Sequence, residues 1–276
     1  MNSPDHYAVF GHPIGHSQSP RIHTLFAAQT GQDMSYTAQD VPAESFEGEV
    51  RRFFSEGGQG LNCTVPLKEL AFRFADALSE RARRAGAVNT LAHRDDGAIL
   101  GDNTDGVGLV RDLTNNLGLA LHDRRILILG AGGATRGILA PILEHRPSLL
   151  TIANRTASKA AQLAEEFSDL GPVAGGGFCE LTGKSYDLIL NATAASLSGD
   201  VPELPPGILA SEGSCYDLAY GKLPTAFVHW GNTAGAVISA DGIGMLVEQA
   251  AEAFLLWRNV RPDTQAVIRV LNEARG

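Results

Sequence analysis

The chain has 276 residues, of which 44% are hydrophobic and 19% charged, a composition that excludes an intrinsically disordered protein and allows two compact domains. Lys and Arg number 22 against 31 Asp and Glu, and this formal net charge of -9 argues against a nucleic-acid-binding protein. Three scattered cysteines fit neither a disulfide framework nor a zinc site, and we find neither a secretory signal nor an apolar run long enough to span a bilayer. We expect a soluble, cytoplasmic protein.

Short β-branched runs alternate with helical patterns in the first half of the chain. Strands are predicted at residues 7–10, 35–41, 60–65, 87–93 and 98–101, and helices at 21–29, at 45–54, in pieces over 67–85, and at 105–117. Asp95-Asp96-Gly97 indicates a hairpin turn between the last two strands, and Gly118 stands where a helix should end. Such alternation is typical of βαβ units and a mostly parallel sheet.

The alternation continues in the second half. Strands are predicted at residues 125–129, 149–153, 187–190 and 214–217, with a loop rich in Pro and Gly at 198–213. Apolar residues from Ile243 to Leu255 recur at helical spacing and predict a long amphipathic helix, and a last short helix follows Pro262. The predicted fold class is α/β, with two α/β domains.

The predicted strand at 125–129 runs directly into a glycine-rich segment, Gly130-Ala131-Gly132-Gly133-Ala134-Thr135-Arg136-Gly137, which opens a helical pattern. Glycines let the backbone approach a pyrophosphate, and the free amides and dipole of a helix N-terminus face its charge. The match to G-x-G-x-x-G is incomplete, because Thr135 stands where the third glycine would. A structural glycine turn is the alternative, but the strand–turn–helix context favours a Rossmann-like dinucleotide-binding domain.

The next strand indicates which dinucleotide binds. In NAD-binding units an acidic residue about 20 residues onward holds the ribose 2′-hydroxyl, whereas an arginine there accommodates a 2′-phosphate. Here the strand ends in Asn154-Arg155-Thr156-Ala157-Ser158-Lys159, without a carboxylate, and the planar guanidinium of Arg155 suits both adenine and phosphate. An exposed turn with solvated charges is the alternative. We predict NADP rather than NAD.

Polar residues gather at predicted strand ends in the first half. Ser17 and Ser19 precede a helix that Pro20 can begin, so their hydroxyls could bind a substrate carboxylate, although a serine N-cap would explain either one alone. Lys68 lies near a helix start, where a cation opposes the helix dipole unless a carboxylate or substrate compensates it, and a surface lysine is the alternative. Asp105 lies between a strand and a helix, which it could simply cap.

We predict that Lys68 and Asp105 meet in space as a proton-transfer pair. A neighbouring carboxylate favours the protonated form of an amine. The lysine then suits an acid that donates to a carbonyl oxygen during reduction, with Asp105 orienting it.

Together these segments resemble the shikimate dehydrogenase family, in its bacterial biosynthetic type. The matching segments occur in the family's order over nearly the whole chain: Gly15 to Pro20, Asn62 to Glu69, Gly86 to Thr90, Gly101 to Gly106, Gly130 to Gly137, Asn154 to Lys159, Asn191-Ala192-Thr193 and Ala240 to Ala250. Departures are Cys63 where valine is usual, Leu67 where phenylalanine is common, and Thr135. The resemblance implies an oxidoreductase, NADP-dependent shikimate dehydrogenase, which reversibly reduces 3-dehydroshikimate to shikimate in chorismate and aromatic amino acid biosynthesis.

The resemblance also implies roles for single residues. Lys68 and Asp105 would be catalytic, and the substrate would be bound by Ser17, Ser19, Thr64, Asn89, Tyr220 and Gln249. The cofactor NADP would be bound by Glu80, Gly130, Ala131, Gly132, Gly133, Ala134, Asn154, Arg155, Thr156, Lys159, Thr193, Leu218 and Gly242. Of these, Glu80, Leu218 and Gly242 would line the nicotinamide side, and no metal is expected.

Residues 1–104 are expected to form the substrate-binding and catalytic domain, with residues 242–276 packing back on it, and residues 105–241 the NADP-binding domain. The active site would then lie in the cleft between the domains. The expected partner is the small-molecule substrate, with neither nucleic acid nor membrane. The sequence leaves the oligomeric state open, with a homodimer as the candidate.

Three alternatives stay open at this point. His12, His16 and His23 cluster early, but without a partner carboxylate they are a poor basis for a metal enzyme. A quinate/shikimate dehydrogenase using NAD would share the chemistry, and the lack of an acidic residue at Asn154-Arg155 speaks against it. A non-catalytic dinucleotide-binding sensor would keep the glycine turn but would not need the lysine and aspartate together.

Overall fold

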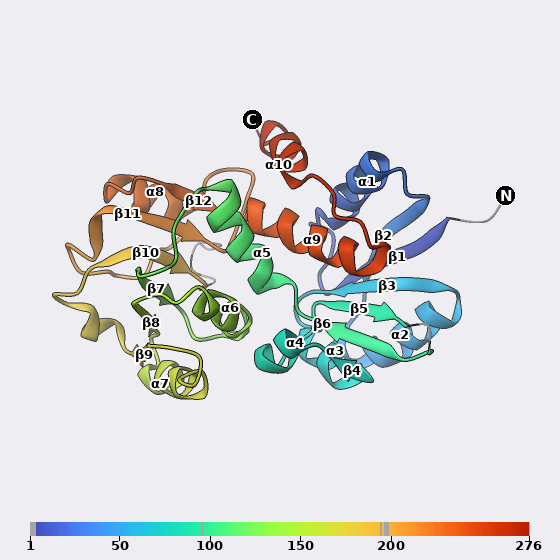
Figure 1. The fold of residues 1–276 in the computed structure, drawn as a ribbon, viewed down its shortest axis with the longest axis horizontal. Helices are drawn as coiled ribbons and strands as arrows, with labels where there is room; N and C mark the ends of the chain where they lie inside the picture. Colours follow the sequence, from blue (N-terminus) through green and yellow to red (C-terminus); the bar gives the residue numbers. More distant parts are fainter. Residues whose placement is uncertain (1–3, 95, 194, 196–198, 276) are drawn as a thin grey trace. The chain divides into compact units, whose positions relative to one another are not determined.

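A computed structural model describes residues 4–94, 96–193, 195 and 199–275 of the chain. The chain divides into two compact units: residues 1–108 with 246–271 (unit 1), and residues 109–245 with 272–276 (unit 2). It leaves unit 1 within helix α5 (Asp105–Arg111) and returns to it within helix α9 (Ile243–Arg258). Each unit is built around one six-stranded sheet with helices beside it (Figure 1), which confirms the α/β class with two domains.

Unit 1 has a mixed sheet with strand order β2-β1-β3-β5-β6-β4. Its strands are β1 (Asp5–Gly11), β2 (Met34–Asp40), β3 (Gly58–Cys63), β4 (Ala77–Leu78), β5 (Thr90–His93) and β6 (Ile99–Asp102). β1 is parallel to β2 and β3, and β4 is parallel to β6, whereas β5 is antiparallel to both β3 and β6. Besides parts of α5 and α9, the helices are α1 (Ser19–Thr30), η1 (Ala43–Ser45), α2 (Phe46–Ser55), α3 (Lys68–Phe74), α4 (Glu80–Ala85) and most of α10 (Thr264–Glu273).

Alternate side chains of β1 enter two apolar layers, one on each face of the sheet. Ala8 and Phe10 pack in the cluster that contains Phe46, Val50 and Phe53 of α2. Tyr7 and Val9 pack in the cluster that contains Tyr36 of β2, with Trp257 of α9 against it. Because successive side chains of a strand point to opposite faces, a continuous apolar run such as β1 predicts a strand that is covered on both sides.

One expectation for unit 1 differs from the structure in detail, and another is met. The helical stretch predicted over 67–85 is interrupted by β4, because the backbone becomes extended at Ala75 and pairs with β6. The hairpin between β5 and β6 is antiparallel as expected, and of its turn Asp95 lies outside the described residues.

Unit 2 has an all-parallel sheet with strand order β12-β11-β10-β7-β8-β9. Its strands are β7 (Arg125–Leu129), β8 (Leu149–Ala153), β9 (Val173–Gly176), β10 (Tyr186–Asn191), β11 (Leu209–Asp217) and β12 (Ser239–Asp241). Its helices, besides the remaining parts of α5, α9 and α10, are the π-helical turn η2 (Asp112–Asn116), α6 (Gly133–Glu144), α7 (Ala157–Glu166), η3 (Phe178–Leu181) and α8 (Ala226–Thr233). The first three strands of this unit lie to one side of the β7–β10 junction and the last three to the other, which is the order of Rossmann-like dinucleotide-binding sheets.

Two strands of unit 2 were not predicted, and one loop was predicted to be longer than it is. β9 ends in two glycines and β12 has only three residues, so neither gives a β-branched run. The loop predicted at 198–213 is wrong in its last part, because β11 begins at Leu209, and residue 198 lies outside the described residues.

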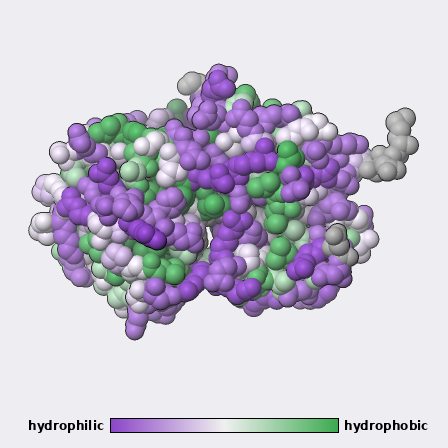
Figure 2. Space-filling model, viewed as in Figure 1, coloured by the Kyte–Doolittle hydropathy of each residue, from purple (hydrophilic) through white to green (hydrophobic). Residues whose placement is uncertain are grey.

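On the face shown in Figure 2, hydrophilic residues cover much of the surface and hydrophobic residues lie between them in smaller groups. Within the described part of the chain, no helix combines the length and the apolar character that a membrane crossing requires.

Candidate functional site

Six predicted substrate-binding or catalytic residues of unit 1 lie beside strand ends: Ser17, Ser19, Thr64, Lys68, Asn89 and Asp105. β1 and β3 are parallel, so the segments that follow them leave the sheet at the same edge. β5 runs the opposite way between β3 and β6, so its beginning and the end of β6 lie at this edge as well. The mixed topology therefore directs the four separate stretches of sequence that carry these six residues to one edge of the sheet.

Lys68 and Asp105 are in direct contact. They are the first residues of α3 and α5, and Lys68 Nζ lies 2.5 Å from Asp105 Oδ2. The two side chains are 29% and 19% exposed, so the pair is partly shielded from water yet still open to a small molecule. The second carboxylate oxygen, Oδ1, accepts a hydrogen bond of 2.9 Å from Asn89 Nδ2. The Asp105 carboxylate is thus bonded to two side chains and compensates a cation at a helix N-terminus.

Asn89 is the centre of the polar contacts around this pair. Its Oδ1 accepts hydrogen bonds from the backbone N–H of Thr104 and from the Thr90 hydroxyl, each at 2.9 Å. Its Nδ2 lies 3.3 Å from Oε1 of Gln249, which α9 brings to unit 1. Gln249 itself is oriented by the bond of its Nε2 to the Leu246 carbonyl at 2.8 Å.

Ser17, Ser19 and Thr64 lie in the segments that follow β1 and β3. The N-cap of α1 is Gln18, without a side-chain capping bond, so the alternative of a serine at the N-cap is not what the structure has. Ser17 Oγ instead accepts a hydrogen bond from the Ser19 N–H at 3.3 Å. The Thr64 N–H donates to the Phe10 carbonyl at 2.9 Å, which ties the end of β3 to β1.

The glycine-rich segment of unit 2 lies between β7 and α6, where the order of the strands reverses. Gly130 has a φ of +104°, a conformation that disfavours other residues. A Cβ at Gly132 or Gly133 would have no neighbour within 4 Å, so the N-terminus of the 12-residue helix α6 is open. No acidic side chain stands in its first turn. These residues fit a dinucleotide pyrophosphate.

Thr135 takes the place of the third glycine by bonding to the turn itself. Its side chain is fully buried, and Oγ1 donates a hydrogen bond of 2.9 Å to the Gly130 carbonyl. The departure from the glycine pattern therefore stabilises the turn from inside and leaves its exposed amides uncovered.

The segment after β8 carries the predicted 2′-phosphate ligands. Arg155, Thr156 and Lys159 are exposed, and neither cation forms an ion pair with another described residue. Asn154 Nδ2 donates to the Thr156 carbonyl at 3.0 Å and so shapes the turn into α7. Two free cations beside an open helix N-terminus fit an additional phosphate group.

The remaining predicted cofactor residues of unit 2 are held by a buried carboxylate network. Asp217 is fully buried and accepts hydrogen bonds from Asn191 Nδ2 at 3.1 Å and from the Thr225 hydroxyl at 2.6 Å. The Thr193 hydroxyl donates to Asn191 Oδ1 at 2.7 Å. A Cβ on Gly242 would lie 2.3 Å from the Leu218 carbonyl oxygen, so only glycine fits there.

Tyr220 and Glu80 are the last two residues of the predicted site. Tyr220 lies in unit 2, where burial raises the pKa of its phenol. Glu80 is the exposed first residue of α4 in unit 1, 4.0 Å from Arg84.

Among the described residues, which include the three early histidines, no group of three or more His, Cys, Asp or Glu residues is placed so that it could hold a metal ion. The expectation that these histidines lack a carboxylate partner is wrong for His12, whose Nδ1 bonds to Asp40 of β2. Strand pairing explains the contact, because Gly11 and Asp40 are register partners. Asp40 raises the pKa of His12.

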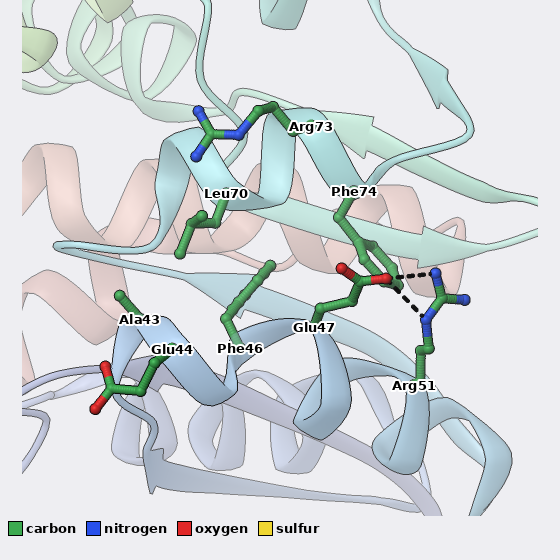
Figure 3. Close-up of a pocket in the computed structure, with 8 residues that line it drawn as sticks. All are labelled: Ala43, Glu44, Phe46, Glu47, Arg51, Leu70, Arg73 and Phe74. Carbon is green, nitrogen blue, oxygen red and sulfur yellow. Dashed lines mark hydrogen bonds and ion pairs between the residues drawn. The ribbon is translucent and has the colours of Figure 1, made fainter.

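A surface pocket of about 300 Å³ lies elsewhere in unit 1, between the η1–α2 segment and α3. Figure 3 shows Glu47 and Arg51 joined at one side, with Phe46, Leu70 and Phe74 between the helices. The Arg51 guanidinium lies 5.2 Å from the centre of the Phe74 ring. None of the predicted site residues lines this pocket, so it is separate from the Lys68–Asp105 cluster.

Sequence reasoning missed Tyr36 and gave no role to Asn62 or Thr90, which are buried behind the cluster. Tyr36 donates to Asn62 Oδ1 at 2.6 Å, and Asn62 Nδ2 donates to Thr90 Oγ1 at 3.0 Å. Asn62 and Thr90 could have been suspected, because polar side chains inside strands need partners. Tyr36 gave no such signal, since a tyrosine in a strand is ordinary core material.

Comparisons with known proteins match this chain to family models and to curated proteins. Residues 9–91 match the shikimate dehydrogenase substrate binding domain, residues 112–197 the shikimate / quinate 5-dehydrogenase model, and residues 242–271 the shikimate 5'-dehydrogenase C-terminal domain. The chain is 67% identical to the shikimate dehydrogenase (NADP(+)) of Methylococcus capsulatus, covering 100% of this chain and 99% of that protein.

Two solved structures are also similar. An Ael1 enzyme from Pseudomonas putida is 49% identical, with a TM-score of 0.90 and coverage of 97% of this chain and 98% of that one. The shikimate 5-dehydrogenase of Thermus thermophilus, solved in complex with NADP(H) and shikimate, is 33% identical, with a TM-score of 0.87 and coverage of 98% and 99%. The chain therefore belongs to the shikimate dehydrogenase (NADP(+)) family.

Proposed function

We propose that Lys68 and Asp105 are the acid/base pair with which this chain works as an NADP-dependent shikimate dehydrogenase. The activity is the reversible reduction of 3-dehydroshikimate to shikimate (EC 1.1.1.25), a step of aromatic amino acid biosynthesis. The observation that carries the proposal for the pair is the 2.5 Å contact of an ammonium and a carboxylate at an edge crowded with neutral hydrogen-bonding groups.

Reduction of a ketone requires a hydride at the carbonyl carbon and a proton at the oxygen. The hydride would come from NADPH held at the N-terminus of α6, leaving NADP⁺. Lys68 Nζ donates the proton to the oxygen as it becomes a hydroxyl, and in the oxidative direction the amine takes that proton back. Asp105 holds the Lys68 Nζ in position for this transfer.

The other residues of unit 1 at this edge suit a polyhydroxylated carboxylic acid. Ser17 and Ser19 would hold the carboxylate, and Thr64, Asn89 and Gln249 the ring hydroxyls. A site built to bond hydroxyls rejects analogues that lack them by large factors, because its buried polar groups are then left unpaired. Tyr220 of unit 2 would assist at the carboxylate.

In unit 2, the cofactor would be held at the N-terminus of α6. Gly130, Ala131, Gly132, Gly133 and Ala134 would face the pyrophosphate, and Asn154, Arg155, Thr156 and Lys159 the adenosine 2′-phosphate. Thr193, Leu218 and Gly242 of unit 2, and Glu80 of unit 1, would line the nicotinamide. Support comes from the open helix N-terminus and from two exposed cations without partners among the described residues.

A cytoplasmic location and a homodimeric assembly are further proposals. The location is supported by three cysteines that are free, two of them buried, which suits a reducing compartment. Light scattering of the purified protein tests the assembly.

The pair is tested by Lys68→Ala, assayed as shikimate-dependent reduction of NADP⁺ at 340 nm. We expect a loss of turnover of at least about 10³-fold. The variant loses both the proton transfer and the group that positions the reacting hydroxyl oxygen of the substrate. The affinity for NADP⁺ should stay within about twofold, since the α6 site is separate in sequence and fold.

Lys184→Ala, which removes an exposed lysine of unit 2, is the matched control and should turn over normally. Near-normal turnover of Lys68→Ala would show that the pair is not catalytic. Quinate and NAD⁺ in the same assay test the broader quinate/shikimate alternative.

A further inference from the structure

We propose that Tyr36 is a positioning residue, which orients the Lys68–Asp105 pair through a one-way chain of hydrogen bonds over Asn62, Thr90 and Asn89. This inference rests on the proposed role of the pair. Each link lies within unit 1, is no longer than 3.0 Å, and joins side chains brought together by β2, β3 and β5.

The direction of the chain is fixed at its inner end by one backbone group. The Thr104 N–H can only donate, and it points to Asn89 Oδ1 at 2.9 Å. The other end of this amide, Nδ2, must therefore face Asp105, to which it donates at 2.9 Å. Because Asn89 Oδ1 can only accept, the Thr90 hydroxyl must donate its single hydrogen to that oxygen.

The same logic continues outward from Thr90. With its hydrogen used, Thr90 Oγ1 can only accept in its contact with Asn62, so Asn62 presents Nδ2. A second observation fixes this amide independently, because Nδ2 also lies 3.0 Å from the Asn89 carbonyl, which can only accept. Asn62 Oδ1 then faces Tyr36, whose hydroxyl must donate, at 2.6 Å.

Tyr36 is itself held rigidly at the outer end. It is 8% exposed, and its ring stacks on that of His23 with centroids 4.1 Å apart and planes within 5°. Ser19, proposed above to bind the substrate carboxylate, lies close enough to Tyr36 to lower the pKa of its phenol against the larger rise that burial causes. The chain of hydrogen bonds therefore begins near the carboxylate end of the proposed substrate site and ends at the proton-transfer pair.

The consequence for catalysis follows from the saturation of Asn62. Its two amide hydrogens and its oxygen all have partners. Removing the Tyr36 hydroxyl leaves the Asn62 oxygen buried without a donor, and a shift of Asn62 that relieves this loss stretches its bonds to Thr90 and to the Asn89 carbonyl. Asn89 is then held less firmly, and the carboxylate that holds Lys68 becomes less well ordered.

The test is steady-state kinetics of Tyr36→Phe, which keeps the ring on His23 and removes only the hydroxyl. We expect kcat for shikimate oxidation to fall roughly tenfold with KM changed by less than about twofold, because alignment is lost and not binding. The matched control is Tyr7→Phe: Tyr7 is the register partner of Tyr36 on β1, is 2% exposed, and contacts Arg258 instead of Asn62. Its kcat should be that of the parent.

A second pair of variants probes the middle of the chain. Thr90→Val removes the hydroxyl at nearly constant volume and should lower kcat to the same extent, whereas Thr90→Ser keeps the hydroxyl and should restore it. If both sites act through one chain, Tyr36→Phe with Thr90→Val should be no slower than the slower single variant.

Multiplying losses in the double variant, equal losses in Tyr7→Phe, or normal kcat in either Tyr36→Phe or Thr90→Val would each overturn the inference. The melting temperature of each variant confirms that a folded enzyme is assayed. The Lys68→Ala variant separates the two proposals: if it is inactive while Tyr36→Phe is normal, only the hydrogen-bond chain fails. If it turns over normally, the proposed pair fails.

Discussion

His23 should make the stability of unit 1 depend on pH in a way that one substitution removes. Its ring is fully buried, both nitrogens lack a hydrogen-bond partner among the described residues, and it packs on Phe26, Tyr36, Phe254 and Trp257. Burial alone lowers the pKa of His23 from 6.5 to about 3. Protonation is thus opposed in the folded chain and free in the unfolded chain.

The sign and size follow from proton linkage. Because the folded pKa lies below the unfolded one, the stabilisation is complete above the unfolded value and is lost as pH falls through it. Between pH 8 and pH 5, the unfolded state gains about 2 kcal/mol from protonation of this histidine, and any folded pKa below about 4 gives nearly the same value.

The assay is urea unfolding at both pH values, followed by tryptophan fluorescence in a Trp230→Phe background. Trp257 then reports on unit 1 alone, since Trp230 belongs to unit 2. His23→Phe keeps an aromatic ring without a titrating group, and its loss of stability between pH 8 and pH 5 should be smaller by about 2 kcal/mol. His93→Gln, at an exposed histidine that ends β5, is the control and should keep the parent's dependence.

A pH dependence in His23→Phe equal to that of the parent would refute this reasoning. It would mean that the histidine finds a partner or water when it is protonated.

Two further predictions concern unit 2. Arg155→Asp should weaken NADP⁺ binding about 10- to 100-fold, as loss of a charge-assisted bond does, and should weaken NAD⁺ far less; titration calorimetry with both nucleotides checks this, and equal losses would contradict the 2′-phosphate role. Thr135→Val should lower the free energy of unfolding of unit 2 by about 1–3 kcal/mol, because the buried Gly130 carbonyl loses its donor. Thr135→Ser should recover most of it in urea unfolding followed by the fluorescence of Trp230, the tryptophan of unit 2, in a Trp257→Phe background, and similar stability of the two variants would show that the hydroxyl is dispensable.

The parts of the fold that the sequence could predict are those with a local cause. The run from Arg125 through the glycines into α6 has a strand, a turn and a helix in immediate succession, each with its own residue preference. The polar residues at strand ends were recognisable for the same reason. β9 and β12 were not, because two glycines and a three-residue length leave only the neighbouring strand to define them.

The contacts within the site were harder to predict from the sequence, because they join residues that are far apart in the chain. Gln249 approaches Asn89 only because α9 returns to unit 1. His23 was grouped with His12 and His16 because they are close in sequence. In the structure, α1 places the ring of His23 within an aromatic cluster. Tyr36 carries one polar atom on a residue that otherwise suits the core, so its hydrogen bond to Asn62 follows from strand packing and not from any local pattern.

The pair itself is tested most directly by a double-mutant cycle on kcat with Lys68→Ala and Asp105→Asn. When two groups act as one unit, removing either one removes the effect of both. The kcat of each single variant should therefore fall at least about 10³-fold, and the kcat of the double variant should fall no further. Losses that multiply in the double variant, or turnover near that of the parent in either single variant, would contradict proton transfer by an aspartate-held lysine.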